Sequence, residues 1–122
     1  MQKAVDITHT EPLRKFVEEL LLCVCRRHKI WLSELYSRRH DDVVAARGEA
    51  AEKLRKHVQS CIVGRNCWYR LVDDKGAVYW TEAGVPVQGN WRELPLPRLG
   101  WLLGLDHTSV LMALRRRAEA AS

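Results

Sequence analysis

Four consecutive polar side chains near the C-terminal end have the chemistry to read another molecule: Asp106, His107, Thr108 and Ser109. A carboxylate can accept a hydrogen bond from N4 of cytosine, and a threonine methyl group can pack against the C5-methyl group of thymine. An imidazole ring can make a polar or an apolar contact with a base edge. These residue types therefore fit contacts with base edges in duplex DNA, if a rigid element presents them together.

Two helices are predicted to present these residues. The stretch Leu96–Gly104 predicts a short helix, with Pro97 in its first turn and Gly104 just beyond its end. After a tight turn, Asp106 can cap a second helix that buries Val110, Leu111 and Leu114. Two helices, a glycine turn and polar residues at the start of the second helix predict a helix-turn-helix over residues 95–118.

Structural explanations stay open for each of these residues. Asp106 can serve as a helix cap without contacting DNA, because one carboxylate oxygen can hardly cap a helix and contact a base at the same time. An isolated His107 is more often structural or simply exposed than functional. The run Arg115–Arg117 also fits a charged helix end that interacts favourably with the helix dipole.

The N-terminal half predicts three more helices in residues 8–57. Apolar residues at steps of three and four predict an amphipathic helix over Glu11–Arg27, with Thr10 as its N-cap. A short helix is expected over Trp31–Tyr36. The acidic pair Asp41 and Asp42 favours the start of a third helix that runs to about His57. Basic residues of this third helix are expected on its outside: Arg47, Lys53, Arg55 and Lys56.

Residues 58–92 break the helical pattern. The β-forming stretches Cys67–Val72 and Ala77–Thr81 flank Asp73–Gly76, which predicts a β-hairpin. We expect its aromatic residues to form a small satellite core rather than a stacking surface for nucleic acid. The chain is thus predicted to be one mainly α domain over residues 1–122, with about five helices and the hairpin inserted before the helix-turn-helix.

The charge balance favours a polyanionic partner. Lys and Arg number 20 against 15 Asp and Glu, a formal net charge of +5. The basic residues gather in four clusters: Arg26–Lys29, Arg38–His40, Lys53–Lys56 and Arg115–Arg117. A run of charges is usually a solvated face, so the clusters form a DNA footprint only if the fold brings them together.

The C-terminal motif resembles the DNA-binding domain of the bacterial chromosomal replication initiator DnaA. The resemblance rests on Leu96-Pro97-x-Leu99-Gly100-x-x-Leu103-Gly104-x-Asp106-His107-Thr108-Ser109-Val110-Leu111-x-Ala113. A second match covers Ile30 to Arg47, with its basic loop at Arg38 and Arg39. The resemblance implies a helix-turn-helix bundle like that of the DnaA C-terminal domain and of the Trp repressor.

The resemblance also implies a role for each matched residue. Arg38 and Arg39 lie in the basic loop, and Arg39 would enter the minor groove. Arg55 and the backbone around Leu96 and Pro97 would hold phosphates. The residues from Asp106 to Ser109 would face the major groove. Two departures are evident, because Leu105 replaces the arginine usual in this family and the inserted hairpin replaces a short loop.

Enzymatic chemistry has little support in the sequence. We find no Gly-x-x-x-x-Gly-Lys-Ser/Thr phosphate loop, no nucleophile within a known motif and no paired carboxylates at a recognisable spacing. His57, Cys61 and Cys67 match no zinc-ligand spacing, so no metal or cofactor is expected and the four cysteines are predicted to be free thiols. No secretion signal or membrane-spanning segment is recognisable, which favours a cytoplasmic, nucleoid-associated protein.

Together these features predict a sequence-specific double-stranded-DNA-binding protein, a bacterial or phage regulator of transcription or replication. The alternative is an interaction module that docks a replication or transcription protein through the hairpin. The target sequence and the oligomeric state are not encoded in any recognisable motif.

Overall fold

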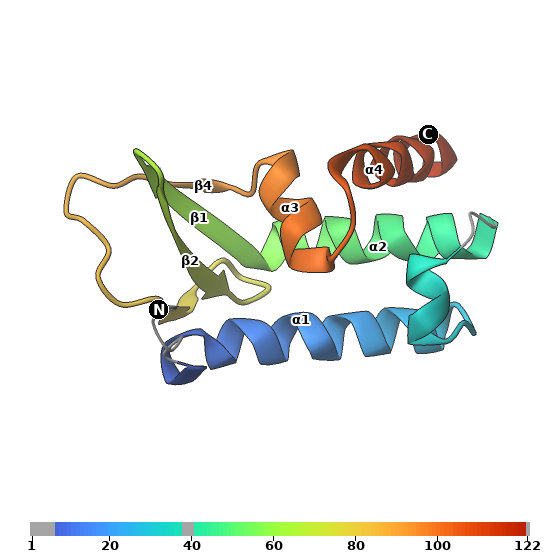
Figure 1. The fold of residues 1–122 in the computed structure, drawn as a ribbon, viewed down its shortest axis with the longest axis horizontal. Helices are drawn as coiled ribbons and strands as arrows, with labels where there is room; N and C mark the ends of the chain where they lie inside the picture. The colour runs from blue at the N-terminus through green and yellow to red at the C-terminus, as the bar shows by residue number, and fades with distance from the viewer. Residues whose placement is uncertain (1–6, 38–40, 122) are drawn as a thin grey trace, which may run out of the picture.

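The chain forms a small α+β fold in the computed structural model, which describes residues 7–37 and 41–121 (Figure 1). Within these ranges there are four α-helices, one 3-10 helix and four strands. The elements in chain order are α1 (Ile7–Arg27), η1 (Leu32–Tyr36), α2 (Asp41–His57), β1 (Val58–Val63), β2 (Asn66–Val72), β3 (Val78–Thr81), β4 (Trp91–Glu93), α3 (Leu96–Leu103) and α4 (His107–Ala121). The predicted mainly α bundle of about five helices with one hairpin is therefore wrong.

The helices lie close to their predicted positions. In α1 the buried residues Leu13, Val17, Leu21 and Val24 follow the predicted apolar stripe. Helix α1 starts at Ile7, so Thr10 lies within the helix and the predicted N-cap is wrong. Helix α2 carries Asp41 and Asp42 in its first turn and basic residues in its last turn, which matches the charge preference of a helix dipole.

The sheet is larger than the predicted hairpin. Strands β2 and β3 do pair antiparallel, and the Asp73 carboxylate accepts hydrogen bonds from the backbone of Lys75 and Ala77 in the turn between them. Strand β1 pairs with β2 on one side and with β4 on the other, giving the order β3-β2-β1-β4. The hairpin prediction is confirmed, but it covers only half of an antiparallel sheet.

Helix α2 lies at the centre of the helical layer. It runs between α1 and α4, and the sheet extends from its C-terminal end (Figure 1). The core is continuous across both parts, because Val58, Leu71 and Leu94 of the strand region belong to the same buried cluster as Leu54 and Leu99. No helix in the described part of the chain has the length and apolar character needed to cross a membrane.

Candidate nucleic-acid interface

Helices α3 and α4 are joined by a turn that folds back onto α3. Gly104 ends α3 in the left-handed conformation, with φ of 73°. The amide of Leu105 then donates to the Gly100 carbonyl at 2.9 Å. A Cβ atom at Gly100 would lie only 2.6 Å from the Leu105 carbonyl oxygen. The glycine at position 100 thus allows the closest approach of the turn to α3, and this approach fixes the angle at which α4 leaves.

One side of α4 is fixed against α2. Val110 and Ala113 are almost completely buried there, at 0% and 1% exposure. A Cβ atom at Gly48 of α2 would lie 2.8 Å from the Ala113 carbonyl oxygen, so the two backbones are in direct contact. The opposite side of α4 therefore faces solvent.

The residues predicted to contact bases lie together at the exposed start of α4. Asp106, His107 and Thr108 are exposed, and Ser109 is half-buried. The Ser109 hydroxyl donates to Oδ1 of Asp106 at 2.5 Å. This hydrogen bond lowers the pKa of Asp106 below its ordinary value, so the carboxylate is ionised at neutral pH. A carboxylate can accept at both of its oxygens, so this contact is compatible with a second one from a base.

The basic loop itself, with Arg38 and Arg39, lies outside the described residues. Its N-terminal flank is held against the end of α3, because the Tyr36 hydroxyl donates to the Leu103 carbonyl at 2.9 Å. The flank on the other side, Asp41, is ion-paired with Arg116 of α4 at 3.0 Å. Both described neighbours of the loop therefore contact α3 or α4.

Arg47 is buried, at 6% exposure, although the sequence placed it on the outside of α2. Its Nε donates to the Leu35 carbonyl at 2.8 Å, and its terminal nitrogen donates to the Ser37 carbonyl at 3.2 Å. The prediction is wrong because the end of η1 offers carbonyl oxygens that satisfy the guanidinium inside the fold. Arg47 thus positions the residues that lead into the basic loop.

Arg55, which the resemblance assigns to a phosphate contact, lies beside the residues that lead into α3. Its Nε is 3.4 Å from the Leu94 carbonyl oxygen and 3.0 Å from Oε1 of Glu93. Leu96 is half-buried and Pro97 is exposed. The fold therefore brings Arg55 to the backbone of Leu94, two residues before Leu96, but the charge of Arg55 is already partly neutralised by Glu93.

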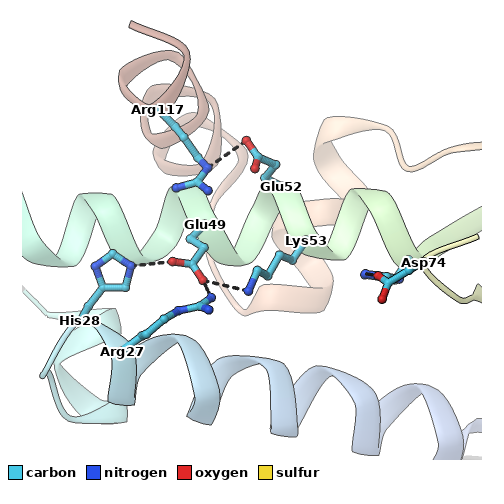
Figure 2. Close-up of polar contacts among 8 residues, drawn as sticks. Arg27, His28, Glu49, Glu52, Lys53, Asp74 and Arg117 are labelled. Carbon is cyan, nitrogen blue, oxygen red and sulfur yellow. Dashed lines mark hydrogen bonds and ion pairs between the residues drawn. The ribbon is translucent and has the colours of Figure 1, made fainter. Parts of the chain in front are cut away.

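Two of the four basic clusters converge on one buried carboxylate, which the sequence did not single out. Figure 2 shows Arg27, His28 and Lys53 around Glu49, whose side chain is 9% exposed. Nε2 of His28 is 2.9 Å from Oε1, and Nζ of Lys53 is 3.1 Å from Oε2. Arg27 forms a further ion pair with the same carboxylate. These side chains join the end of α1 to α2, and their contacts with Glu49 hold them to the fold.

The stability of this cluster is expected to depend on pH through His28. Burial lowers the pKa of His28 below 6.5, and Arg27 and Arg117 act in the same direction while Asp42 opposes them. Below pH 6.5 the unfolded chain therefore binds a proton more readily than the folded chain, and the free energy of unfolding falls. His28→Gln is expected to remove this part of the pH dependence, while its side-chain amide can still donate to Glu49.

The measurement compares denaturant midpoints of the parent and the variant at about pH 7.5 and about pH 5.5. Both proteins keep the other histidines, so only the difference between them reports on His28. An identical loss of stability in the two proteins would assign the acid sensitivity to other groups.

The cluster at Arg115–Arg117 divides between the fold and solvent. Arg117 pairs with Glu52 at 2.8 Å, as Figure 2 shows, and Arg116 pairs with Asp41. Arg115 is exposed and forms no ion pair with any residue that the structure describes. Of these three arginines on α4, Arg115 is therefore the one whose charge is not paired with a described carboxylate.

The aromatic residues of the strand region are distributed between core and surface. Tyr69 is buried at 6% exposure and joins the main core, whereas Tyr79 is 57% exposed on the edge strand β3. The Arg70 guanidinium lies over the Trp91 ring, 4.6 Å from its centroid.

Among the described residues, no group of three His, Cys, Asp or Glu side chains lies close enough to hold a metal ion.

The chain has no match among protein-family models, curated proteins or solved structures. The resemblance to the DnaA domain therefore still rests on the sequence motif alone. Any function must be argued from the geometry of the site.

Proposed function

We propose that this protein binds duplex DNA in a sequence-specific way, with α4 in the major groove, and regulates transcription or replication. The observation that carries the proposal is the exposed start of α4, where Asp106, His107 and Thr108 lie on a helix whose other side is locked onto α2. A helix of about 10–12 Å diameter fits the major groove, which is about 12 Å wide. Base contacts by these three residues would then supply specificity.

The exposed stripe of α4 continues beyond its first turn. Thr108, Met112 and Arg115 follow each other at steps of four and three residues, so they lie on one side of the helix. Met112 is 43% exposed, and Arg115 is exposed one turn further on. Along α4, the apolar side chain of Met112 and then the cation of Arg115 therefore follow the residues proposed to contact bases. We assign Arg115 to a phosphate contact, because phosphates are the strongest anions along a duplex.

Phosphate contacts on both sides of α4 would fix its register. Tyr36, which precedes the basic loop of Arg38 and Arg39 in the chain, contacts the end of α3, and Arg55 lies near the residues that precede α3. Cations at such positions contribute affinity whatever the sequence, because their binding releases counterions from the duplex.

The second candidate function is docking of a replication or transcription protein through the hairpin. It is favoured by β3, an edge strand on which Val78 and Tyr79 are 44% and 57% exposed. An edge strand can pair with an extended segment of a partner. Apolar strand pairing depends little on salt, whereas phosphate binding depends on it strongly.

Selection of bound sequences from a random duplex pool tests the proposal most directly. A single consensus is expected, and affinity for that consensus is expected to fall steeply as salt rises. Failure to enrich any sequence would remove the specific-binding proposal. A flat salt titration would favour the docking function.

Glu93→Gln is expected to strengthen binding to duplexes of any sequence by about fivefold. The substitution removes the carboxylate that is 3.0 Å from Arg55 and frees the guanidinium for a phosphate. The control is Glu18→Gln, which removes the same charge from an ion pair with Arg14 on α1. Affinities of both variants would be measured by fluorescence anisotropy with a labelled duplex. An equal gain in both variants would show a net-charge effect and would exclude Arg55 as a phosphate ligand.

A further inference from the structure

An open cavity of about 660 Å³ lies between α1, the start of β2 and α3. Its apolar wall is formed by Leu13, Val17 and Leu21 of α1. Trp101 and Leu102 of α3 line it from the other side. Cavities of roughly 300–1,000 Å³ with a mainly apolar lining and a few polar groups are typical of small-molecule sites.

Tyr69, one of the residues that line this cavity, has a buried hydroxyl without a hydrogen-bond partner among the described residues. Tyr69 is 6% exposed, and its hydroxyl forms no hydrogen bond with any group in the described part of the chain. Such a group is costly to bury unless something accepts its hydrogen bond. The Cys67 thiol and the Arg98 guanidinium, which also line the cavity, lie near enough to influence its pKa. Burial raises that pKa further above its ordinary value, so the hydroxyl remains protonated and can donate.

The charges around the cavity favour an anion. Arg65 and Arg98 line it, and neither forms an ion pair with any residue in the ranges 7–37 and 41–121. Arg14 also lines it, so three arginines lie against two carboxylates, Glu18 and Glu82. Glu18 is 3.6 Å from Arg14, and Oε1 of Glu82 accepts a hydrogen bond from the Tyr69 amide at 3.0 Å.

We propose that this cavity binds a small amphipathic carboxylate, with its apolar body against α1, its carboxylate near Arg98 and Arg65, and the Tyr69 hydroxyl as a hydrogen-bond donor. A small molecule fits better than a folded partner because a cavity of about 660 Å³ has the size typical of small-molecule sites. The ligand would bridge α1 and α3. This site stands on the cavity and its lining, and it does not rest on DNA binding.

Four probes of similar size separate the contributions of charge and shape. Octanoate and 1-naphthoate carry a carboxylate on an aliphatic and an aromatic body, octan-1-ol is neutral and octylammonium is cationic. Binding to the full chain would be measured by calorimetry and by tryptophan fluorescence, to which Trp101 in the lining is expected to respond. At least one carboxylate is expected to bind about tenfold or more tightly than octan-1-ol, and octylammonium more weakly still.

Two variants test the assigned side chains against a matched control. Arg98→Gln is expected to weaken carboxylate binding by about tenfold or more, and Tyr69→Phe by about fivefold. The control Arg92→Gln removes an exposed arginine outside the cavity lining and is expected to bind like the parent. Tyr69→Phe is also expected to be at least as stable as the parent without ligand, because it removes an unsatisfied buried hydroxyl.

The proposal is overturned if neither carboxylate binds, or if the alcohol or the ammonium probe binds as tightly as both carboxylates. It is equally overturned if Arg98→Gln binds carboxylates like Arg92→Gln. A Tyr69→Phe variant that loses stability but keeps full affinity would show that the hydroxyl serves the fold and not a ligand.

Discussion

Thr108→Ala and His107→Ala are each expected to lower affinity for the selected duplex by about 5- to 150-fold, or roughly 1–3 kcal/mol. The reason is that both side chains are exposed at the start of α4 and would contact base edges only in the correct sequence. Affinity for a scrambled duplex is expected to change little, since phosphate contacts remain. Each variant would be titrated against both duplexes after circular dichroism has confirmed its fold.

Two further substitutions give this experiment its contrast. Thr81→Ala removes an exposed threonine from the edge strand β3 and is expected to bind both duplexes like the parent. Arg39→Ala is expected to weaken binding to both duplexes and to reduce the salt slope by about one unit, because it removes a cation that would lie near the phosphates in the minor groove. If Thr108→Ala and His107→Ala bind both duplexes like Thr81→Ala, then α4 does not read bases.

Gly48→Ala is expected to destabilise the protein by about 1–3 kcal/mol. In an exposed helix the same substitution stabilises by about 1 kcal/mol, because alanine is the better helix former. Here the new Cβ atom would lie 2.8 Å from the Ala113 carbonyl oxygen, and a backbone atom cannot move aside without shifting α4. The sign of the effect therefore reports whether α2 and α4 are in direct contact.

The control variant is Ala45→Gly, on the exposed side of α2, which measures the helix propensity difference between alanine and glycine alone. That substitution is expected to cost about 1 kcal/mol, the ordinary propensity difference. Denaturant unfolding of both variants gives the two free energies on one scale. A Gly48→Ala variant more stable than the parent would show that α4 does not pack on α2 in this way.

The helices were predictable because their signals are local. Helix α2 has Asp41 and Asp42 in its first turn and basic residues in its last turn. Helix α3 has Pro97 in its first turn and ends before Gly104. The β2–β3 hairpin was predictable for the same reason, since the turn residues lie between two β-forming stretches. In each case the information lies within about ten residues along the chain.

Strands β1 and β4 were missed because their signals are not local. Strand β1 follows α2 directly, with His57 the last helical residue and Val58 the first residue of the strand, so no turn residue separates the two. Strand β4 has three residues and is defined by pairing with β1, for example Gln59 with Glu93. Pairing across this separation in sequence leaves no periodicity to recognise.

The candidate site was predictable only in part. The motif identified the residues at the start of α4, which are exposed, and it named Arg55 together with the backbone around Leu96 and Pro97 as phosphate contacts. It did not predict that Arg55 is ion-paired, nor that Arg47 is buried against carbonyl groups. Charges in a helix look alike in sequence, and the partners that bury or neutralise them come from other elements. Glu49 was overlooked for this reason.

The pairing of β1 with β4 also decides where the chain tolerates extra length. The polypeptide leaves α2 at Val58 and returns to the helices at Leu96, where α3 begins. The two ends of the strand region lie close together because Gln59 pairs with Glu93. Because the two ends of the strand region lie close together, residues can be inserted in a loop far from these ends without separating α2 from α3. Val87, fully exposed in the long connection before β4, is such a position. An epitope or fluorophore grafted there would report on the protein while α3 and α4 keep their places on α2.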